Sequence, residues 1–308
     1  MITYASTPII EASPMRPVER LIDRIEQVLA RFEATLPRAQ SAPDWKKGLA
    51  YRWRKRENSG FLQAVAHPHK IRLTDLQGID DQKKLIEQNT RQFIEGLTAN
   101  NVLLTGARGT GKSSVVKSLL HKYSSKGLRL IEVDKQDLKD LPDIVDLLAE
   151  VPYKFILFCD DLSFDADEPG YKALKVILDG SISATSENIL IYATSNRRHL
   201  MPEFMQENLQ TRYLGEEIHP GESVEEKVSL SERFGLWVSF YPFDQEEYLK
   251  IVGYWLVQLG VPEAFSGPKA RNEALQWALM RGSRSGRVAW QFARDWAGRH
   301  KVSAEPRK

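Results

Sequence analysis

The chain has 308 residues, a formal net charge of +2 and a hydrophobic content of 42%, which is typical of a globular protein with one large domain or two smaller ones. Its single cysteine, Cys159, excludes a disulfide framework and lies in an apolar run, so we expect it to be buried. The six histidines lack metal-ligand spacing, which argues against a zinc site. No signal-peptide pattern and no membrane-spanning apolar stretch occur, so we expect a cytoplasmic protein without membrane contact.

Two features precede the main domain. Apolar residues recur at helical spacing from residue 18 to residue 36, between Pro17 and Pro37, which predicts an amphipathic helix that docks on another surface. A basic and aromatic cluster follows at residues 44–56. The cluster suits contacts with the phosphates and bases of nucleic acid, or with a DNA-bound protein. The more common alternative is that its aromatic side chains pack on the core. The cluster contains Trp45, Lys46, Lys47, Tyr51, Arg52, Trp53, Arg54, Lys55 and Arg56.

From about residue 70, short apolar runs alternate with helical segments. Strands are predicted at residues 101–105, 128–133, 154–159, 188–194 and 236–241. Runs without polar alternation are typical of a parallel sheet covered on both faces. Helices are predicted at residues 244–259, 269–280 and 286–299. We therefore expect an α/β fold, a parallel five-stranded sheet with flanking helices and a C-terminal helical lid. The expected divisions are an N-terminal arm (1–70), an α/β domain (71–243) and the lid (244–308).

The segment GARGTGKS at residues 106–113 matches the phosphate-binding pattern GxxxxGK[ST], between a predicted strand and a predicted helix. Glycines let backbone N–H groups surround phosphates, and the helix N-terminus adds partial positive charge. Lys112 is expected to reach the β- and γ-phosphates of ATP, and Ser113 to ligate Mg²⁺. The predicted nucleotide-binding residues are Gly106, Ala107, Arg108, Gly109, Thr110, Gly111, Lys112, Ser113 and Ser114.

Two carboxylates end the strand predicted at residues 154–159, which is the Walker B arrangement. Asp160 is expected to hold Mg²⁺, and Asp161 to orient the attacking water as general base. Many proteins with a Walker B motif carry Glu at the position of Asp161. Because Asp is one methylene shorter, the sequence does not determine the rate of hydrolysis. Asn196 ends the predicted strand at residues 188–194, where its amide can bond the attacking water or the γ-phosphate.

Two further arginines follow in chain order. Arg233 directly precedes the last predicted strand, where it either caps a helix at the surface or projects into the ATP site of a neighbouring subunit as an arginine finger. Arg287, with Arg284 as the alternative, lies in the last helical unit, where it can return to the phosphates.

These motifs resemble, in content and order, a family of bacterial AAA+ ATPases known only as a domain of unknown function. The matching segments include NNVLLTGARGTGKSS, FILFCDDLSF, ATSNRRHL, SLSERFGLWVSFYPF and GSRSGR. The resemblance implies an AAA+ fold and the site roles given above, with Asn196 as sensor 1 and Arg287 as sensor 2. It also implies that Ile79 lines the adenine, unless its segment is an ordinary turn before a helix. The Asp-Asp pair and the TSN triplet are similar to those of replication initiators and helicase loaders.

Two functions are consistent with these residues. The first is an ATP-hydrolysing AAA+ enzyme that assembles into a ring or filament of identical subunits and remodels a partner. The second is a nucleotide-gated switch or loader module that hydrolyses ATP slowly and binds protein or DNA. Arg233 and Asp161 favour the first function, whereas the acidic segment after the second predicted strand lacks the aromatic pore loop of protein-threading machines.

Overall fold

The computed structural model describes residues 17–35, 42–56, 59–164, 168–179, 187–197, 212–214, 217–219, 230–261 and 268–304. The chain divides into two compact units, Met1–Ala42 and Pro43–Lys308. The first unit contains helix α1 (Pro17–Thr35), which begins at Pro17 as predicted. Proline is well suited to this position, because the first turn of a helix leaves its N–H groups unbonded anyway.

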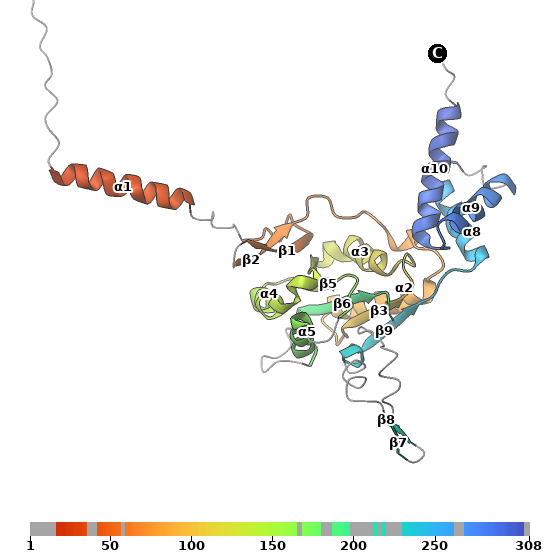
Figure 1. The fold of residues 1–308 in the computed structure, drawn as a ribbon, viewed down its shortest axis with the longest axis horizontal. Helices are drawn as coiled ribbons and strands as arrows, with labels where there is room; N and C mark the ends of the chain where they lie inside the picture. The colour runs from red at the N-terminus through yellow and green to blue at the C-terminus, as the bar shows by residue number, and fades with distance from the viewer. Residues whose placement is uncertain are drawn as a thin grey trace, which may run out of the picture. The chain divides into compact units, whose positions relative to one another are not determined.

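The second unit is built on a seven-stranded sheet with the order β2-β1-β4-β5-β6-β3-β9 (Figure 1). The five adjacent strands β4, β5, β6, β3 and β9 are parallel, and they are the strands predicted from the sequence. Their bounds are β3 (Val102–Gly106), β4 (Leu128–Glu132), β5 (Lys154–Cys159), β6 (Ile189–Ser195) and β9 (Leu236–Phe240). A separate two-stranded ladder pairs β7 (Arg212–Leu214) with β8 (Glu217–His219).

The sheet has seven strands instead of the expected five, because a hairpin of β1 (Ala50–Arg56) and β2 (Ser59–Ala64) adds two strands. Strand β1 pairs in parallel with β4, and β2 pairs antiparallel with β1. Strand β1 comes from the basic and aromatic cluster, and of the cluster's two interpretations the packing one is observed. Tyr51 and Trp53 are buried, and the ring of Trp45 contacts that of Phe155 at 5.0 Å.

The cations of β1 pair with acidic side chains of the same unit. Arg52 bonds Glu132, Arg54 bonds Asp134 and Lys55 bonds Asp140, at N–O distances of 2.5, 2.9 and 2.8 Å. Side chains alternate between the two faces of a strand, so the aromatic residues at every second position of β1 face one side. Strands β1 and β2 therefore extend the sheet, although the sequence placed their residues in an arm outside the α/β domain.

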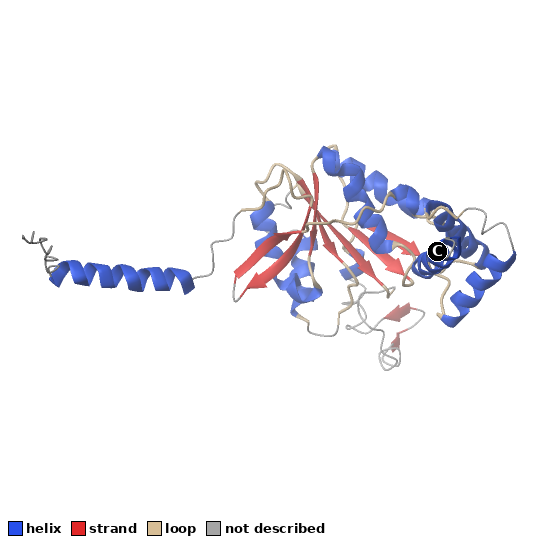
Figure 2. Ribbon diagram, turned by 90° about the horizontal axis from the view of Figure 1, so that it is seen from above, coloured by secondary structure: helices blue, strands red, loops and turns tan. Residues whose placement is uncertain are grey.

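Two helical layers cover the sheet, as Figure 2 shows. The core side chains alternate along each strand, so that Val102 and Leu104 belong to one cluster and Leu103 to the other. The first cluster includes residues of α2 (Asp80–Ile94) and α3 (Lys112–Tyr123), and the second includes residues of α4 (Leu141–Leu148) and α5 (Pro169–Asp179). Cys159 is fully buried as expected, and burial raises the pKa of its thiol to about 12.

Three helices follow the last strand, α8 (Gln245–Gln258), α9 (Pro268–Met280) and α10 (Gly286–Ala304). They match the predicted lid helices. Asp244 caps α8 by accepting a hydrogen bond from the backbone N–H of Glu247, and the Glu247 carboxylate bonds back to the N–H of Asp244. Alanines that are buried along α9 allow the three helices to pack closely. Among the described helices, none combines the length and apolar content needed to cross a bilayer.

Candidate nucleotide-binding site

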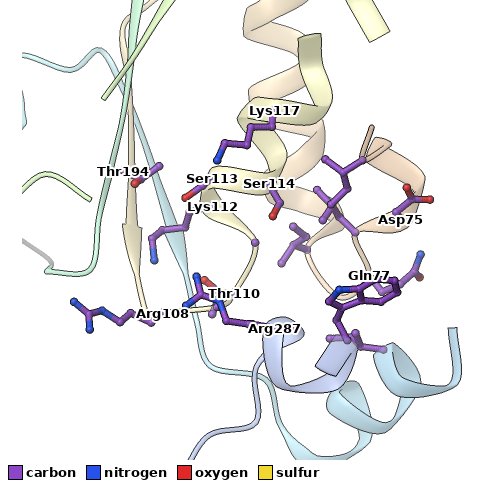
Figure 3. A pocket seen from close by; sticks show the side chains of 18 of the residues that line it. Asp75, Gln77, Arg108, Thr110, Lys112, Ser113, Ser114, Lys117, Thr194 and Arg287 are labelled. Atoms are coloured by element: carbon purple, nitrogen blue, oxygen red, sulfur yellow. The ribbon is translucent and has the colours of Figure 1, made fainter. Parts of the chain in front are cut away.

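A cavity of about 910 Å³ opens at the carboxyl ends of β3, β5 and β6, between the sheet and the lid helices (Figure 3). This edge of an open parallel sheet is where α/β proteins bind their ligands. The lining residues come from the segment before α2, the loop between β3 and α3, the first turns of α3, the ends of β5 and β6, and helices α8 and α10. They include Ile79, Arg108, Gly109, Thr110, Gly111, Lys112, Ser113, Ser114, Asp160, Asp161, Asn196 and Arg287. The structure thus brings together most of the predicted site.

The loop between β3 and α3 has a backbone that side chains would not tolerate. Gly106, Gly109 and Gly111 have φ angles of 128°, 78° and 103°, in the region that favours glycine. A Cβ on Gly106 would lie 1.9 Å from the carbonyl oxygen of Phe240 on β9. The loop therefore needs its glycines both for its curvature and for its fit against the sheet. Gly111 directly precedes α3, so the N–H groups of the first helical turn face the cavity side of the loop.

Lys112 begins helix α3 and extends its ammonium group across the loop. The Nζ atom donates to the carbonyl oxygens of Gly106 and Ala107, both at 2.7 Å, and to Oδ1 of Asn196 at 3.1 Å. Burial lowers the pKa of Lys112 to about 8, although the carboxylates of Asp161 and Asp160 act in the opposite direction. With a pKa this low, the charged form of Lys112 is only weakly favoured, so an anionic ligand would stabilise that form strongly.

Ser113 and Asp160 are joined by a direct hydrogen bond. The Ser113 hydroxyl donates to Oδ1 of Asp160 at 2.6 Å, and the Thr194 hydroxyl donates to the same oxygen at 2.6 Å. Thr194 also accepts a hydrogen bond from the backbone N–H of Asp161. A hydroxyl and a carboxylate oxygen side by side form the hard oxygen ligand set that Mg²⁺ requires, so the residues present fit this ion.

Asp161 occupies an unusual position at the end of β5. Among the described non-glycine residues only Asp161 has a positive φ angle, 55°, and such a conformation costs on the order of 1–2 kcal/mol. Its carboxylate accepts a hydrogen bond from the Asn196 amide and lies 3.8 Å from the guanidinium of Arg108. The positive φ angle and this hydrogen bond place the carboxylate of Asp161 beside the Asn196 amide.

The lid closes the other side of the cavity. The backbone N–H of Gly286 donates to the carbonyl oxygen of Gly109 at 2.9 Å, which joins the start of α10 to the phosphate-binding loop. Arg287 follows and lines the cavity (Figure 3), whereas Arg284 is not among the lining residues described. The geometry therefore favours Arg287 of the two arginines considered. Ile79 is buried, and its Cδ1 would lie 3.2 Å from a Cβ on Gly111.

Arg233 is not among the described residues that line this cavity. Its guanidinium pairs with the carboxylate of Asp179 on α5. The structure thus separates Arg233 from the nucleotide site of its own chain. A role at the site of another subunit stays a prediction.

Sequence reasoning missed several lining residues. Thr194 positions Asp160 by its hydrogen bond and lies on β6, two residues before Asn196, which follows the end of this strand. Lys117 lies one helical turn after Ser113 on α3 and extends its side chain along the cavity (Figure 3). Helical periodicity could have identified it. Trp255 and Trp290 pack edge to face at 4.5 Å between lid helices, and only the tertiary structure brings them to the cavity.

A protein-family model decides the family. The model described as "Protein of unknown function (DUF815)" matches residues 46–300. The chain belongs to this family. The DUF815 match runs from the turn before β1 into α10, so it includes the edge hairpin as well as the sheet and the lid. None of the curated proteins matches the sequence at a significant level.

Solved structures show the fold of this DUF815 chain. The structure of the Aeropyrum pernix Orc1 protein in complex with DNA is similar with a TM-score of 0.51 and 14% identity, over 75% of this chain and 62% of that chain. The chain therefore spans less than two thirds of the length of that relative. The Thermotoga maritima RuvB Holliday junction branch migration motor is similar with a TM-score of 0.38 and 14% identity, over 72% and 70% of the two chains. The α/β fold predicted from the sequence is thus confirmed, and the Orc1 structure shares it.

Proposed function

We propose that this chain binds ATP with Mg²⁺ in the cavity and hydrolyses it. The observation that carries the proposal is the convergence of Lys112, Ser113, Asp160 and Asp161 around a glycine loop at the start of a helix. Each of these groups has a distinct part in phosphoryl transfer. In this proposal the triphosphate lies along the loop, and the base lies toward Ile79 and the lid.

Lys112 binds the triphosphate as a cation. Its three present hydrogen-bond acceptors are two backbone carbonyls and the Asn196 amide. Phosphate oxygens are stronger acceptors because they carry charge, so the ammonium exchanges some of these bonds for phosphate contacts. Arg287 approaches the same cavity from α10 and adds a further positive charge. Binding of the nucleotide thus ties the lid to the phosphate-binding loop.

Ser113 and Asp160 would hold Mg²⁺ through their side-chain oxygens. When bound, this ion neutralises charge on the phosphate oxygens. Thr194 orients Asp160 by its hydrogen bond, and a fixed carboxylate binds the ion with less loss of side-chain entropy. The three oxygens come from α3, β5 and β6, so the ion site depends on the assembled sheet.

Asp161 accepts the proton of the attacking water, and Asn196 orients that water. These side chains already contact each other, and a water molecule that bridges them would face the γ-phosphate held by Lys112. The guanidinium of Arg108 lies 3.8 Å from the Asp161 carboxylate, on the side of the loop. We place hydrolysis at subunit interfaces of a homo-oligomer in the cytoplasm, with Arg233 supplying the arginine finger and the work of hydrolysis remodelling a protein or nucleic-acid partner.

One observation favours the second function, a slowly hydrolysing nucleotide-gated switch. Arg233 pairs with Asp179 of its own chain, and a finger has to leave that pair before it reaches another subunit. The DNA in the Orc1 structure suits a loader-like role. In either case the aromatics of the β1 hairpin do not provide the base-stacking surface, since Tyr51 and Trp53 are buried.

Steady-state turnover of ATP by the full chain, measured at increasing protein concentration, tests the proposal. We expect Mg²⁺-dependent turnover whose specific activity rises with concentration, because each site is completed by a neighbour. Tight ATP binding with negligible turnover at every concentration would establish the switch instead. Absence of ATP binding would refute both functions.

A further inference from the structure

Helix α1 carries an exposed apolar face. Leu21 and Val28 are each 60% exposed, and Ile22, Ile25 and Leu29 are 50–53% exposed. Their spacing of three, four and seven residues places them in a single stripe along the helix. Isolated exposed apolar residues are ordinary, but a contiguous stripe of five marks an interaction site.

The charges beside this stripe are divided by sign. At about 100° per residue, Glu26 lies on the flank next to Ile22 and Leu29, whereas Arg24 and Arg31 lie on the opposite flank, next to Leu21 and Val28. All three charged side chains are exposed. The division continues in the sequence, since Glu19 and Glu33 lie seven residues before and after Glu26. The helix thus has one acidic flank and one basic flank, separated by an apolar stripe.

We propose that α1 pairs in parallel with α1 of a second copy of this chain. In a parallel pair with a two-fold axis along the helices, the acidic flank of each helix faces the basic flank of the other. An antiparallel pair places like flanks together, so Glu faces Glu and Arg faces Arg. Charged residues beside an apolar seam determine the orientation and the partner of paired helices, while the apolar residues provide the affinity.

The pairing is independent of the nucleotide site. Helix α1 belongs to the unit Met1–Ala42, whereas the described residues that line the cavity all belong to Pro43–Lys308. Self-association through α1 therefore requires no nucleotide, and its failure would leave the proposed ATP binding untouched. Conversely, Lys112→Ala should weaken ATP binding without changing this association.

Sedimentation of the full chain without nucleotide, over a range of protein concentrations, tests the association. We expect a concentration-dependent dimer or larger parallel bundle. Ile25→Asp places a carboxylate in the seam and should raise the dissociation constant at least about tenfold. The matched control is Gln27→Asp, the same new side chain on the exposed side of α1 opposite the stripe, and it should leave the constant unchanged. A monomer at every concentration, as expected if α1 packs on its own core, overturns the proposal, and so does an association that Ile25→Asp leaves intact.

Cross-linking tests the parallel orientation. Residue 21 lies toward one end of α1, so only a parallel pair brings its two copies together. On mild oxidation, Leu21→Cys should give disulfide-linked dimers, whereas Gln27→Cys on the opposite side should not. The native Cys159 does not interfere, because it is fully buried. An associated protein in which Leu21→Cys forms no cross-link would overturn the parallel arrangement.

Charge reversal provides an independent check. Arg24→Glu with Arg31→Glu makes both flanks acidic, which should weaken the association severalfold at low salt and less at high salt. A second reversal, Glu26→Arg in that double variant, should restore part of the loss. An association that is insensitive to these charges would contradict the pairing of unlike flanks.

Discussion

The Nζ atom of Lys112 lies 3.1 Å from Oδ1 of Asn196, which joins the phosphate-binding loop to the end of strand β6. The nitrogen of the same amide bonds Asp161 at the end of β5. A cation, an amide and a carboxylate from three segments are thus connected in one hydrogen-bonded chain. In the proposed function, a phosphate that takes up Lys112 would leave Oδ1 of Asn196 to bond water beside Asp161.

The first prediction concerns the loop lysine. Lys112→Ala removes a charged donor, and charge-assisted hydrogen bonds contribute about 1.5–3 kcal/mol, so ATP affinity should fall at least about tenfold. Equilibrium titration with a labelled ATP analogue measures the loss. Lys122→Ala is the matched control, because Lys122 lies on the same helix but pairs with Glu87 outside the cavity. Equal affinities of the two variants would contradict the role of Lys112.

The second prediction follows from the pKa of Lys112, which burial lowers to about 8. The charged form is the one that binds phosphate, and a bound phosphate raises this pKa. Affinity for ATP is therefore at its maximum below pH 8 and falls as the pH rises above 8, by up to about tenfold per pH unit, because binding must take up a proton. Titrations between pH 7 and pH 9.5 measure this slope. In Lys112→Ala the slope should disappear.

The third prediction separates binding from hydrolysis. Asp161→Asn preserves the size of the side chain and its contact with Asn196 but removes the proton acceptor, so turnover should fall by roughly 10²–10⁴. ATP affinity should change little, since Asp161 contacts no phosphate in this arrangement. Asp143→Asn, an exposed position on α4, serves as control. Unchanged turnover in Asp161→Asn would refute the assignment of the general base.

The fourth prediction concerns Arg233. If Arg233 acts in a neighbouring subunit, Arg233→Ala should lower turnover by about 10³–10⁵ and abolish its increase with protein concentration. ATP affinity should persist, because Arg233 is not among the described residues lining the cavity. Mixing the variant with Asp161→Asn provides a sharper test. In a mixed oligomer, an interface that combines Asp161 of an Arg233→Ala subunit with Arg233 of an Asp161→Asn subunit contains both groups. Recovered turnover in the mixture therefore indicates that Arg233 acts between subunits.

The fifth prediction tests the β1 hairpin as part of the core. The Trp53 side chain is buried, its Nε1 donates to Asp140 at 3.1 Å, and its ring lies against Gly60. Trp53→Ala should lower the free energy of unfolding by about 3–5 kcal/mol, measured by denaturant titration. Arg56→Ala, at an exposed position at the end of β1, should change it by less than about 0.5 kcal/mol. If Trp53 were a free nucleic-acid contact, the two variants would be equally stable.

The sequence by itself determined the phosphate-binding loop, the five central strands and the lid helices. These features depend on local rules. The spacing of GARGTGKS requires a glycine backbone that only a strand, a loop and a helix in succession provide, and the apolar runs specify strands buried on both faces. Asp160 and Asn196 could be placed at the same edge, because the ends of neighbouring parallel strands converge whatever the loops between them.

Tertiary structure decided the rest. For Trp53 and Tyr51 the sequence left a nucleic-acid surface open beside the more common packing on a core, and pairing of β1 with β4 buries them. Thr194 became a site residue only through its hydrogen bond to Asp160, and the choice of Arg287 over Arg284 came from the packing of α10 on the loop. The physical reason is the same in each case: burial and side-chain direction depend on contacts between segments far apart in the chain, and local spacing does not specify these contacts.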